Sequence, residues 1–247
     1  MTKSHTMIRM TAWVLPLALL SGCAAYDPGA AGPAPASPPP SVATLGDAQI
    51  DAALRDSLQQ GVEAALAVLG RPNGFWSNAA VRIPLPAGLA KAESTLRRAG
   101  LNQALDAFHL ALNSAAEQAA PQAARYFSEA IRQMTIEDVR GVLQGGDDAA
   151  TQYLRRTSGP ALEAQLRLKV AAATQQAGAT QKYKALMADY GPILRAAGVE
   201  GTDLDAFVTA KTLDGIFYMI AAEEARIRRD PRARATELMR EVFARLD

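Results

Sequence analysis

The sequence predicts an all-α protein: a single multi-helix bundle domain of about eight or more helices, preceded by a disordered tether. Ala and Leu dominate the 247 residues, and only 6% are aromatic. Residues with high helix propensity therefore outnumber the β-branched and aromatic residues that favour strands. No long stretch alternates apolar with polar residues, as a half-buried strand would. A fold built on a sheet is accordingly not expected.

Residues 1–22 have the pattern of a bacterial export signal. Lys3 and Arg9 precede an apolar run that is too short to span a bilayer. The string LSGC at residues 20–23 resembles the lipobox of bacterial lipoproteins. This resemblance implies cleavage before Cys23 and acylation of that cysteine. The alternative is an ordinary signal peptide followed by an incidental cysteine.

The residues after Cys23 refine the expected location. Several acyl chains would hold the protein on a membrane durably, whereas a single chain binds only marginally. In such lipoproteins, an Asp directly after the acylated cysteine tends to retain the protein at the inner membrane. Ala24 occupies this position, so the resemblance implies a location on the inner leaflet of the outer membrane, facing the periplasm. Residues 23–46 then comprise the acylated cysteine and a Pro/Ala-rich tether with six prolines, typical of a semi-rigid spacer. A proline-rich ligand for a partner domain is the alternative.

Residues 47–247 are expected to form the all-helical domain. Apolar residues recur there at the spacing of one helix face. The expected core stripes are Ile50, Leu54, Leu58, Val62, Leu66 and Leu69; Leu101, Leu105, Phe108 and Leu112; Tyr126, Phe127, Ala130, Ile131 and Met134; Leu213, Ile216, Phe217 and Ile220; and Leu238, Met239, Val242, Phe243 and Leu246.

Glycines and prolines predict where these helices end. Gly70 stops the first helix, and Pro121 starts a new one at its first position. Gly145-Gly146 ends the helix that begins after Thr135. Gly159-Pro160 is expected to separate two helices, and Gly191-Pro192 to interrupt a helix over roughly 180–190.

Polar residues predict three helix starts. Thr135 with Asp138, and Thr202 with Asp205, have the spacing of a capping box, in which each side chain bonds the backbone of the other. Asp230-Pro231 predicts an N-cap followed by proline at the first helical position.

Residues 71–86, RPNGFWSNAAVRIPLP, break the helical pattern. Pro84 and Pro86 favour an extended path for the residues before them. We expect a long, proline-containing ordered loop that lays apolar side chains on the bundle. A loop that grips a ligand is the alternative.

Three strings resemble one family, the bacterial domain of unknown function 4197. They are NAAVRIPLP at 78–86, MTIEDVRGVLQGGDDAATQYLRRT at 134–157 and TAKTLDGIFYMIAAEEARIRRDPRARATELMREVF at 209–243. The resemblance runs from about residue 48 to the end. It implies a helical protein that is exported, often as a lipoprotein. No activity is assigned to the family.

Composition argues against several function classes. The leader holds two of the 26 basic residues and none of the 25 acidic ones, so the mature chain is near neutral, which gives no reason to expect a nucleic-acid partner. A single cysteine permits no internal disulfide. Asp106 and His109 have the spacing found in di-iron bundles, but the mature chain has no second histidine. We therefore expect no metal and no cofactor.

Six charged residues form a candidate polar site. Asp147 and Asp148 follow a Gly-Gly pair at an expected helix start, where they would cap the helix or hold a cation. Lys211 and Asp214 lie on a very apolar helix, so we expect Asp214 to pair with Lys211 or with an arginine of the string YLRRT. A polar pocket for a small ligand is the alternative. The site comprises Asp147, Asp148, Arg155, Arg156, Lys211 and Asp214.

A second candidate is a basic stretch, RIRRDPRAR, at residues 226–234. It is either a solvated helix junction or a surface for an acidic partner or an anionic lipid headgroup. The candidate residues are Arg226, Arg228, Arg229, Arg232 and Arg234.

Catalytic motifs are missing from the sequence. It contains no Gly-x-Ser-x-Gly, no P-loop and no Gly-x-Gly-x-x-Gly. Glu93-Ser94 resembles the Glu-Ser pair of lytic transglycosylases, without the elements that follow it there. We therefore expect a non-enzymatic, lipid-anchored periplasmic module that binds or scaffolds an envelope protein or a small ligand. The alternatives are a carboxylate-dependent envelope hydrolase using Glu93, Asp147, Asp148 or Asp214, and a small-ligand or cation-binding protein.

Overall fold

A computed structural model describes residues 46–196, 199 and 201–244. The expected export signal, Cys23 and all but the last residue of the expected tether lie outside them. The described part of the chain contains nine α-helices, two short 3-10 helices and no strand, which confirms the all-α prediction. The α-helices are α1 (Asp47–Leu69), α2 (Ala87–Arg98), α3 (Asn102–Ala119), α4 (Ala124–Arg132), α5 (Ile136–Leu143), α6 (Ala149–Gln176), α7 (Ala179–Ala196), α8 (Leu204–Arg229) and α9 (Glu237–Phe243).

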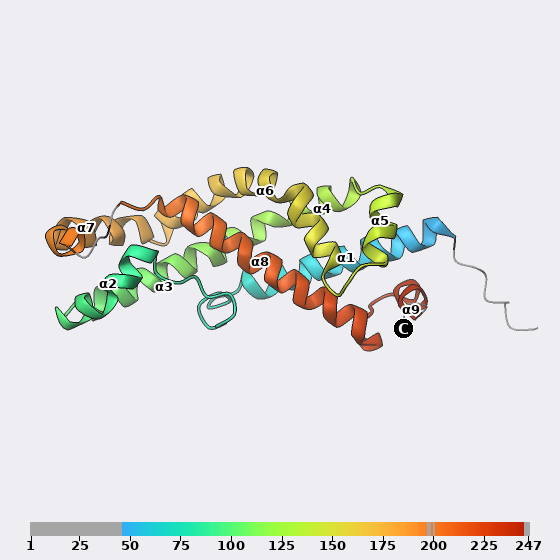
Figure 1. Cartoon of the computed structure of the whole chain (residues 1–247), viewed down its shortest axis with the longest axis horizontal. Coiled ribbons are helices and arrows are strands. Elements are labelled where there is room, and N and C mark those ends of the chain that lie inside the picture. The colour runs from blue at the N-terminus through green and yellow to red at the C-terminus, as the bar shows by residue number, and fades with distance from the viewer. Residues whose placement is uncertain (1–45, 197–198, 200, 245–247) are drawn as a thin grey trace, which may run out of the picture. The chain divides into compact units, whose positions relative to one another are not determined.

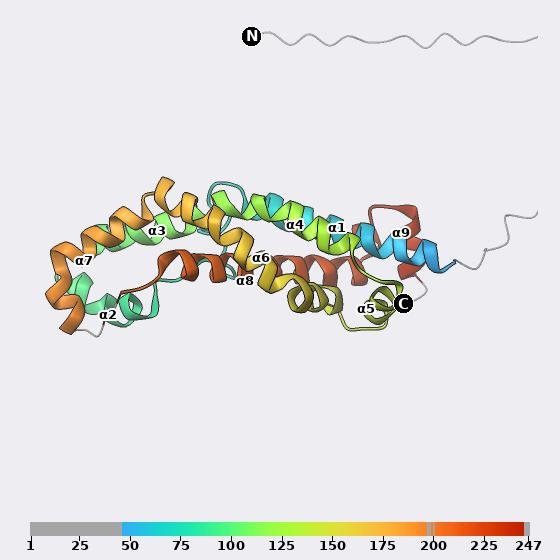
Figure 2. The ribbon, with the colours of Figure 1, turned by 90° about the horizontal axis from the view of Figure 1, so that it is seen from above.

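The long helices lie side by side along one axis. α8 packs against α6 and α1, while α3 packs against α6 and α7, and α4 lies between α1 and α6. Figures 1 and 2 show α5 and α9 near the start of α1, and α2 and α7 at the opposite end. The 3-10 helix η1 (Ala120–Ala123) leads into α4, and the 3-10 helix η2 (Pro231–Ala233) lies between α8 and α9 in the chain.

One continuous core joins these helices. The expected core stripes are buried or partly buried where the structure describes them, and Leu246 lies outside the described residues. Alanines fill much of the rest: α3 alone buries Ala111, Ala115, Ala116 and Ala119. Small side chains let helix backbones approach closely, so a chain with few aromatic residues still packs densely.

The loop at residues 71–86 is ordered and covers the core, as expected. Phe75, Ile83 and Leu85 are buried. Phe75 packs against Gly215 of α8, where an added Cβ would lie 2.7 Å from its ring. Glu117 of α3 holds the turn, because its carboxylate accepts hydrogen bonds from the backbone N–H groups of three loop residues, at 3.1–3.2 Å.

Three predictions of helix boundaries were wrong. α6 does not end at Gly159-Pro160 but continues through Pro160, although it bends along its length (Figure 1). An internal proline removes one backbone hydrogen bond, and the buried stripe that continues on both sides, including Leu154 and Leu162, keeps the helix in place. Residues 87–98, for which no separate helix was predicted, form α2.

The second error concerns the start of α8. Asp203, and not Thr202, is the N-cap, because its carboxylate accepts from the N–H of Ala206 at 2.9 Å. Asp205 instead accepts a hydrogen bond from the hydroxyl of Thr174 at 2.6 Å.

The third error concerns Pro121, which is the second residue of η1 and not the first, while α4 begins at Ala124.

Three other capping and break signals were predicted correctly. Thr135 forms its capping box with Asp138 at the start of α5. Asp230 caps η2, in which Pro231 is the first residue. α7 has a non-helical residue, Tyr190, directly before Gly191-Pro192.

Candidate functional site: a groove between α4 and α6

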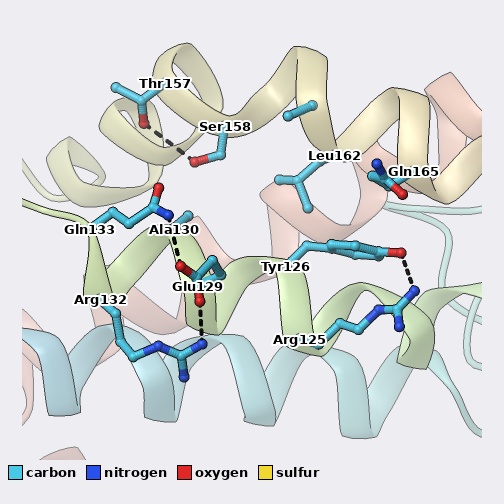
Figure 3. A pocket seen from close by; sticks show the side chains of 11 residues that line it. Arg125, Tyr126, Glu129, Ala130, Arg132, Gln133, Thr157, Ser158, Leu162 and Gln165 are labelled. Carbon is cyan, nitrogen blue, oxygen red and sulfur yellow. Dashed lines mark hydrogen bonds and ion pairs between the residues drawn. The ribbon is translucent and has the colours of Figure 1, made fainter.

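A groove of about 700 Å³ lies between α4 and the middle of α6 (Figure 3). Its floor is apolar and its rims are polar. It is lined by Arg125, Tyr126, Glu129, Ala130, Arg132 and Gln133 from α4 and its C-cap, and by Thr157, Ser158, Ala161, Leu162 and Gln165 from α6. Ligand sites in proteins commonly have this size and this mixture of surfaces.

The two helices leave this groove open for reasons visible in their sequences. α4 turns Phe127 and Ile131 toward the core, so its other residues face outward. α6 buries Leu162 at the edge of the core. The side chains that face the gap between the helices include Ala130, Ser158 and Ala161, which are short and leave it unfilled.

The charges near the centre of the groove neutralise one another. Glu129 pairs with Arg132 at 2.5 Å and accepts a hydrogen bond from the amide of Gln133 at 2.7 Å. The hydrogen bond from Arg132, followed by that from Gln133, lowers the pKa of the Glu129 carboxyl below its ordinary value. The carboxyl of Glu129 is therefore ionised at neutral pH and has no proton to donate.

Arg125 occupies the other end of the groove and is exposed. Its guanidinium donates a hydrogen bond to the hydroxyl of Tyr126 and lies 4.5 Å from the centre of the same ring. It forms no ion pair with any residue that the structure describes. One positive charge at this end is consequently not matched by a carboxylate.

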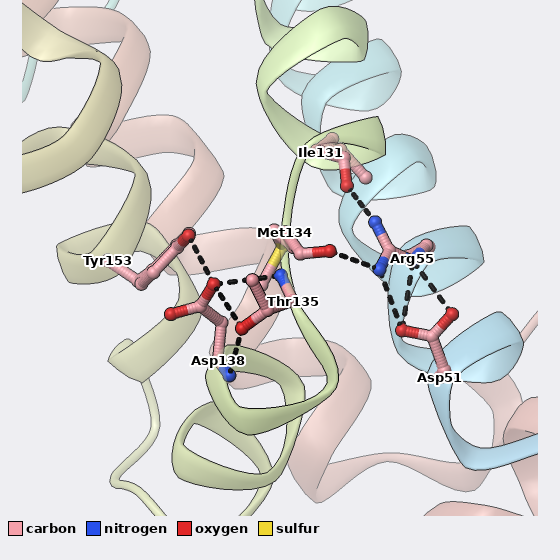
Figure 4. Close-up of polar contacts among 7 residues, drawn as sticks. All are labelled: Asp51, Arg55, Ile131, Met134, Thr135, Asp138 and Tyr153. Atoms are coloured by element: carbon pink, nitrogen blue, oxygen red, sulfur yellow. Dashed lines mark hydrogen bonds and ion pairs between the residues drawn. The ribbon is translucent and has the colours of Figure 1, made fainter. Parts of the chain in front are cut away.

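A polar network adjoins the groove where α5 meets α6 (Figure 4). The carboxylate of Asp138 accepts hydrogen bonds from the N–H and hydroxyl of Thr135, at 2.8 and 2.9 Å, and from the hydroxyl of Tyr153 at 2.8 Å. The hydroxyl of Thr157, on the groove rim, donates to the carbonyl of Tyr153 at 2.9 Å. The network therefore connects α5 to one end of the groove.

The same network shifts two pKa values in opposite directions. The N–H of Thr135, with the hydroxyls of Tyr153 and Thr135, lowers the pKa of Asp138 despite its partial burial. Burial, reinforced by the neighbouring Asp138, raises the pKa of Tyr153. Both groups accordingly keep their ordinary charge near neutral pH, Asp138 as a carboxylate and Tyr153 as a phenol.

Arg55 of α1 holds the end of α4 beside this network (Figure 4). It pairs with Asp51 and donates to the carbonyls of Ile131 and, at 2.6 Å, Met134. The last carbonyls of a helix have no partner within the helix and attract cations. Arg55 therefore supports one end of the groove structurally.

The six predicted residues of the polar site do not come together in one place. Asp147 pairs with Arg229, and Asp148 accepts from Gln152 at 3.0 Å. Arg156 lines a separate hollow between α5 and α6 with Asp138 and Tyr153.

Asp214 has both of the partners that were expected. It pairs with Arg155 at 3.2 Å and with Lys211 at 3.1 Å. The side chain of Asp214 is 52% exposed, so this cluster lies on the surface and forms no buried pocket.

The expected caps at Asp147 and Asp148 were also wrong. Asp148 occupies the N-cap position of α6, yet its side chain accepts no capping hydrogen bond. The carboxylate of Glu224, from α8, caps this end instead. It accepts from the N–H groups of Ala150 and Thr151, at 3.0 and 2.9 Å.

The five predicted arginines do not form one surface patch. Arg234 is 2% exposed and donates to the carbonyls of Ile227 and Arg228 at the end of α8, where unpaired carbonyls favour a cation. Arg228 is nearly buried and pairs with Glu224.

The other three arginines lie at the surface, and two of them are already paired. Arg226 forms an ion pair with Glu223, and Arg229 with Asp147. Arg232 is exposed, and its backbone N–H donates to Asp230 at 2.9 Å.

Two further carboxylates singled out in the sequence share one arginine. Arg97 pairs with Glu93 at 2.9 Å and with Asp106 at 2.7 Å. The hydrogen bond from Arg97 lowers the pKa of Asp106. His109, one helical turn after Asp106 in α3, hydrogen-bonds the carbonyl of Ile83 at 2.7 Å.

Neither a metal cluster nor a membrane-spanning helix is found in the described part of the chain. No group of three or more His, Cys, Asp or Glu side chains there is arranged to hold a metal ion. None of its helices combines the length and apolar character needed to cross a bilayer.

Fold and groove together define an all-helical domain with an amphipathic groove on one side. The chain belongs to the family described as "Protein of unknown function (DUF4197)", whose model matches residues 44–244. No curated protein and no solved structure matches the chain.

Proposed function

We propose that the protein is a non-enzymatic binding module of the bacterial cell envelope, held on a membrane by acyl chains on Cys23. The observation that carries the binding role is the groove between α4 and α6. Its volume of about 700 Å³ and its apolar floor suit a ligand. Its central carboxylate, Glu129, is fixed by Arg132 and Gln133.

The protonation states favour binding over acid–base catalysis. A general acid needs a carboxyl whose pKa is raised toward the working pH. Near the groove, the pKa values of Glu129 and Asp138 are lowered instead. Glu93 and Asp214, candidates for a hydrolase, are engaged in ion pairs with arginine. No observation among the described residues therefore favours the hydrolase alternative.

The sequence before the helical domain supports the anchor. A lipobox-like string ends at Cys23, and a proline-rich segment leads from it to Gly46. In a polyproline conformation such a segment rises about 3 Å per residue, which would hold the module several nanometres from the membrane. We place the protein on the inner leaflet of the outer membrane, facing the periplasm.

Metabolic labelling tests the anchor. Cells expressing the full-length chain receive an alkyne fatty acid, and the purified protein is examined for the label. The native chain is expected to carry it, and Cys23→Ser is expected to lose it. A double variant, Cys23→Ser with Ser41→Cys, controls for cysteine chemistry and should also be unlabelled. Label on Cys23→Ser, or none on the native chain, contradicts the anchor.

A turnover assay tests the non-enzymatic role. The full-length chain is incubated with purified cell-wall glycan, and soluble fragments are measured over time. We expect release at background level for the native chain. A turnover that is lost in any single Ala variant of Glu93, Asp147, Asp148 or Asp214 would instead establish the hydrolase alternative.

A further inference from the structure

We infer that the groove between α4 and α6 binds an extended segment of a partner protein, with an acidic side chain at Arg125 and apolar side chains along the floor. This rests on the proposed function, because it names the ligand class of the same groove. Three features of the groove support it: its unmatched charge, the donors gathered at one end, and its length.

The charge of the groove is unbalanced at one end only. Arg132 is neutralised by Glu129, which lies one helical turn before it. Arg125 has no such partner among the described residues and contacts only Tyr126. A ligand that is complementary to this groove therefore carries one negative charge at the Arg125 end and none at the centre.

The Arg125 end also gathers hydrogen-bond donors. Figure 3 shows Gln165 of α6 above the hydroxyl end of Tyr126, with Arg125 below it. Since the Tyr126 oxygen accepts from Arg125, its own proton is free to be donated to a ligand. A planar guanidinium with a hydroxyl and an amide beside it suits a carboxylate, which accepts several hydrogen bonds.

The floor beside this end is apolar and continues along α4. It is formed by the ring of Tyr126 with Ala130, Ala161 and Leu162. The hydroxyls of Thr157 and Ser158 follow toward the far end (Figure 3) and can bond a peptide backbone. The groove thus offers an acid-binding end, an apolar floor and, toward the far end, hydroxyls on the rim that can bond the peptide backbone.

The length of the groove matches a short extended peptide. Residues 125–133 of α4 and its C-cap rise about 12 Å at 1.5 Å per residue. Four residues of an extended chain cover about the same distance, and alternate side chains point to the same side. The expected motif is therefore an acidic residue with apolar residues two and four positions away. The groove is only partly enclosed, which suits a chain that continues beyond it.

Fluorescence anisotropy with matched peptides tests the inference. The probe is a fluorescein-labelled, C-terminally amidated peptide, Gly-Glu-Ala-Leu-Ala-Leu-Gly, and its partner carries Gln in place of Glu. Each is titrated with the full-length chain in a non-ionic detergent. We expect the Glu peptide to bind about tenfold more tightly, because a hydrogen bond to a charged group is stronger than one to a neutral group.

Three variants locate the effect. Arg125→Gln should abolish the difference between the two peptides. Arg98→Gln is the matched control and should keep the difference, since Arg98 is exposed and, among the residues that the structure describes, its side chain donates only to the carbonyl of Ser94. Ala161→Trp fills the floor of the groove and should weaken the binding of both peptides equally.

Each other outcome overturns the inference. If the two peptides bind with equal affinity and neither binds Ala161→Trp, the groove is a binding site, but it does not select an acidic side chain. A preference for Glu that survives Arg125→Gln would place the charge recognition elsewhere. Displacement of the peptide by an equal concentration of hexanoate would make the site one for small carboxylates. If neither peptide binds, the groove does not bind an extended peptide of this kind.

Discussion

Glu224 of α8 accepts hydrogen bonds from both the backbone N–H and the hydroxyl of Thr151 in the first turn of α6, at 2.9 and 2.8 Å. The free N–H groups of a helix start attract a negative charge. The charge is supplied here by another helix, so the capping of α6 depends on the packing of α8 against it. Arg228 balances the carboxylate from the same face of α8.

Replacing Glu224 should therefore destabilise the fold strongly. Glu224 and Arg228 have side chains only 6% and 10% exposed. Glu224→Gln removes one charge of this buried pair, which commonly costs about 3–5 kcal/mol. Asp47→Asn is the control, because Asp47 and its partner Arg140 are 61% and 55% exposed and surface pairs contribute about 0–1 kcal/mol. Urea unfolding monitored by circular dichroism measures both, and equal losses would contradict the cross-helix cap.

Glu117 should hold the loop at residues 71–86 in place. Its carboxylate accepts from the N–H groups of Asn73, Phe75 and Trp76. Glu117→Gln replaces one acceptor oxygen by a donor, with an expected loss of about 1–3 kcal/mol. Amide hydrogen exchange over residues 73–76 should accelerate. Gln118→Ala changes an exposed neighbour and should leave that exchange unchanged; acceleration in both variants would argue against a specific role of Glu117.

Two glycines should respond to alanine in opposite directions. At Gly215 a Cβ would lie 2.7 Å from the ring of Phe75, so Gly215→Ala should cost about 1–3 kcal/mol through overpacking. At Gly141, inside α5, a Cβ meets nothing within 4 Å. Gly141→Ala should therefore stabilise the protein by about 0.5–1 kcal/mol, because alanine restricts the unfolded chain. Thermal unfolding of the two variants gives the signs, and a shared sign would refute this packing argument.

Asp138 should make stability fall in acid. Its pKa in the folded protein lies below the ordinary 3.8 of the unfolded chain. Its contribution is therefore complete above about pH 3.8 and is lost as the pH falls through the folded pKa. Asp138→Asn should be less stable than the native chain near neutral pH, and the gap should narrow below about pH 3.8. Unfolding free energies measured across this range test it, and a gap that stays constant would contradict the assigned role.

Periodicity and capping patterns predicted most of the helices. The apolar stripe of α1 and the capping box of Thr135 follow from local rules that act over a few residues. The break expected at Gly159-Pro160 failed because tertiary packing on both sides of Pro160 outweighs one lost hydrogen bond. The predicted N-cap of α8, Thr202, was wrong by one residue. The neighbouring Asp203 is also a polar residue that can cap a helix, and it occupies the position.

The candidate site was less predictable because its residues meet through contacts between distant segments. Arg125 and Gln165 belong to the same groove, but each looks like an ordinary exposed residue on its own helix. Glu117 and Glu224 cap backbone far away in sequence. In the sequence, the sign of these long-range caps is a glutamate within an alanine-rich stretch. Arg234 was expected at the surface, and its burial depends on where α8 ends.

The central claim, that the groove is the binding surface of a tethered module, is tested most directly by crosslinking in cells. The full-length chain is crosslinked, purified and analysed by mass spectrometry beside Ala161→Trp, Cys23→Ser and a quadruple Ala variant of Glu93, Asp147, Asp148 and Asp214. We predict one protein partner that is kept by the quadruple variant, reduced by Cys23→Ser and lost in Ala161→Trp. A partner that Ala161→Trp retains, or no partner with the native chain, would contradict the claim.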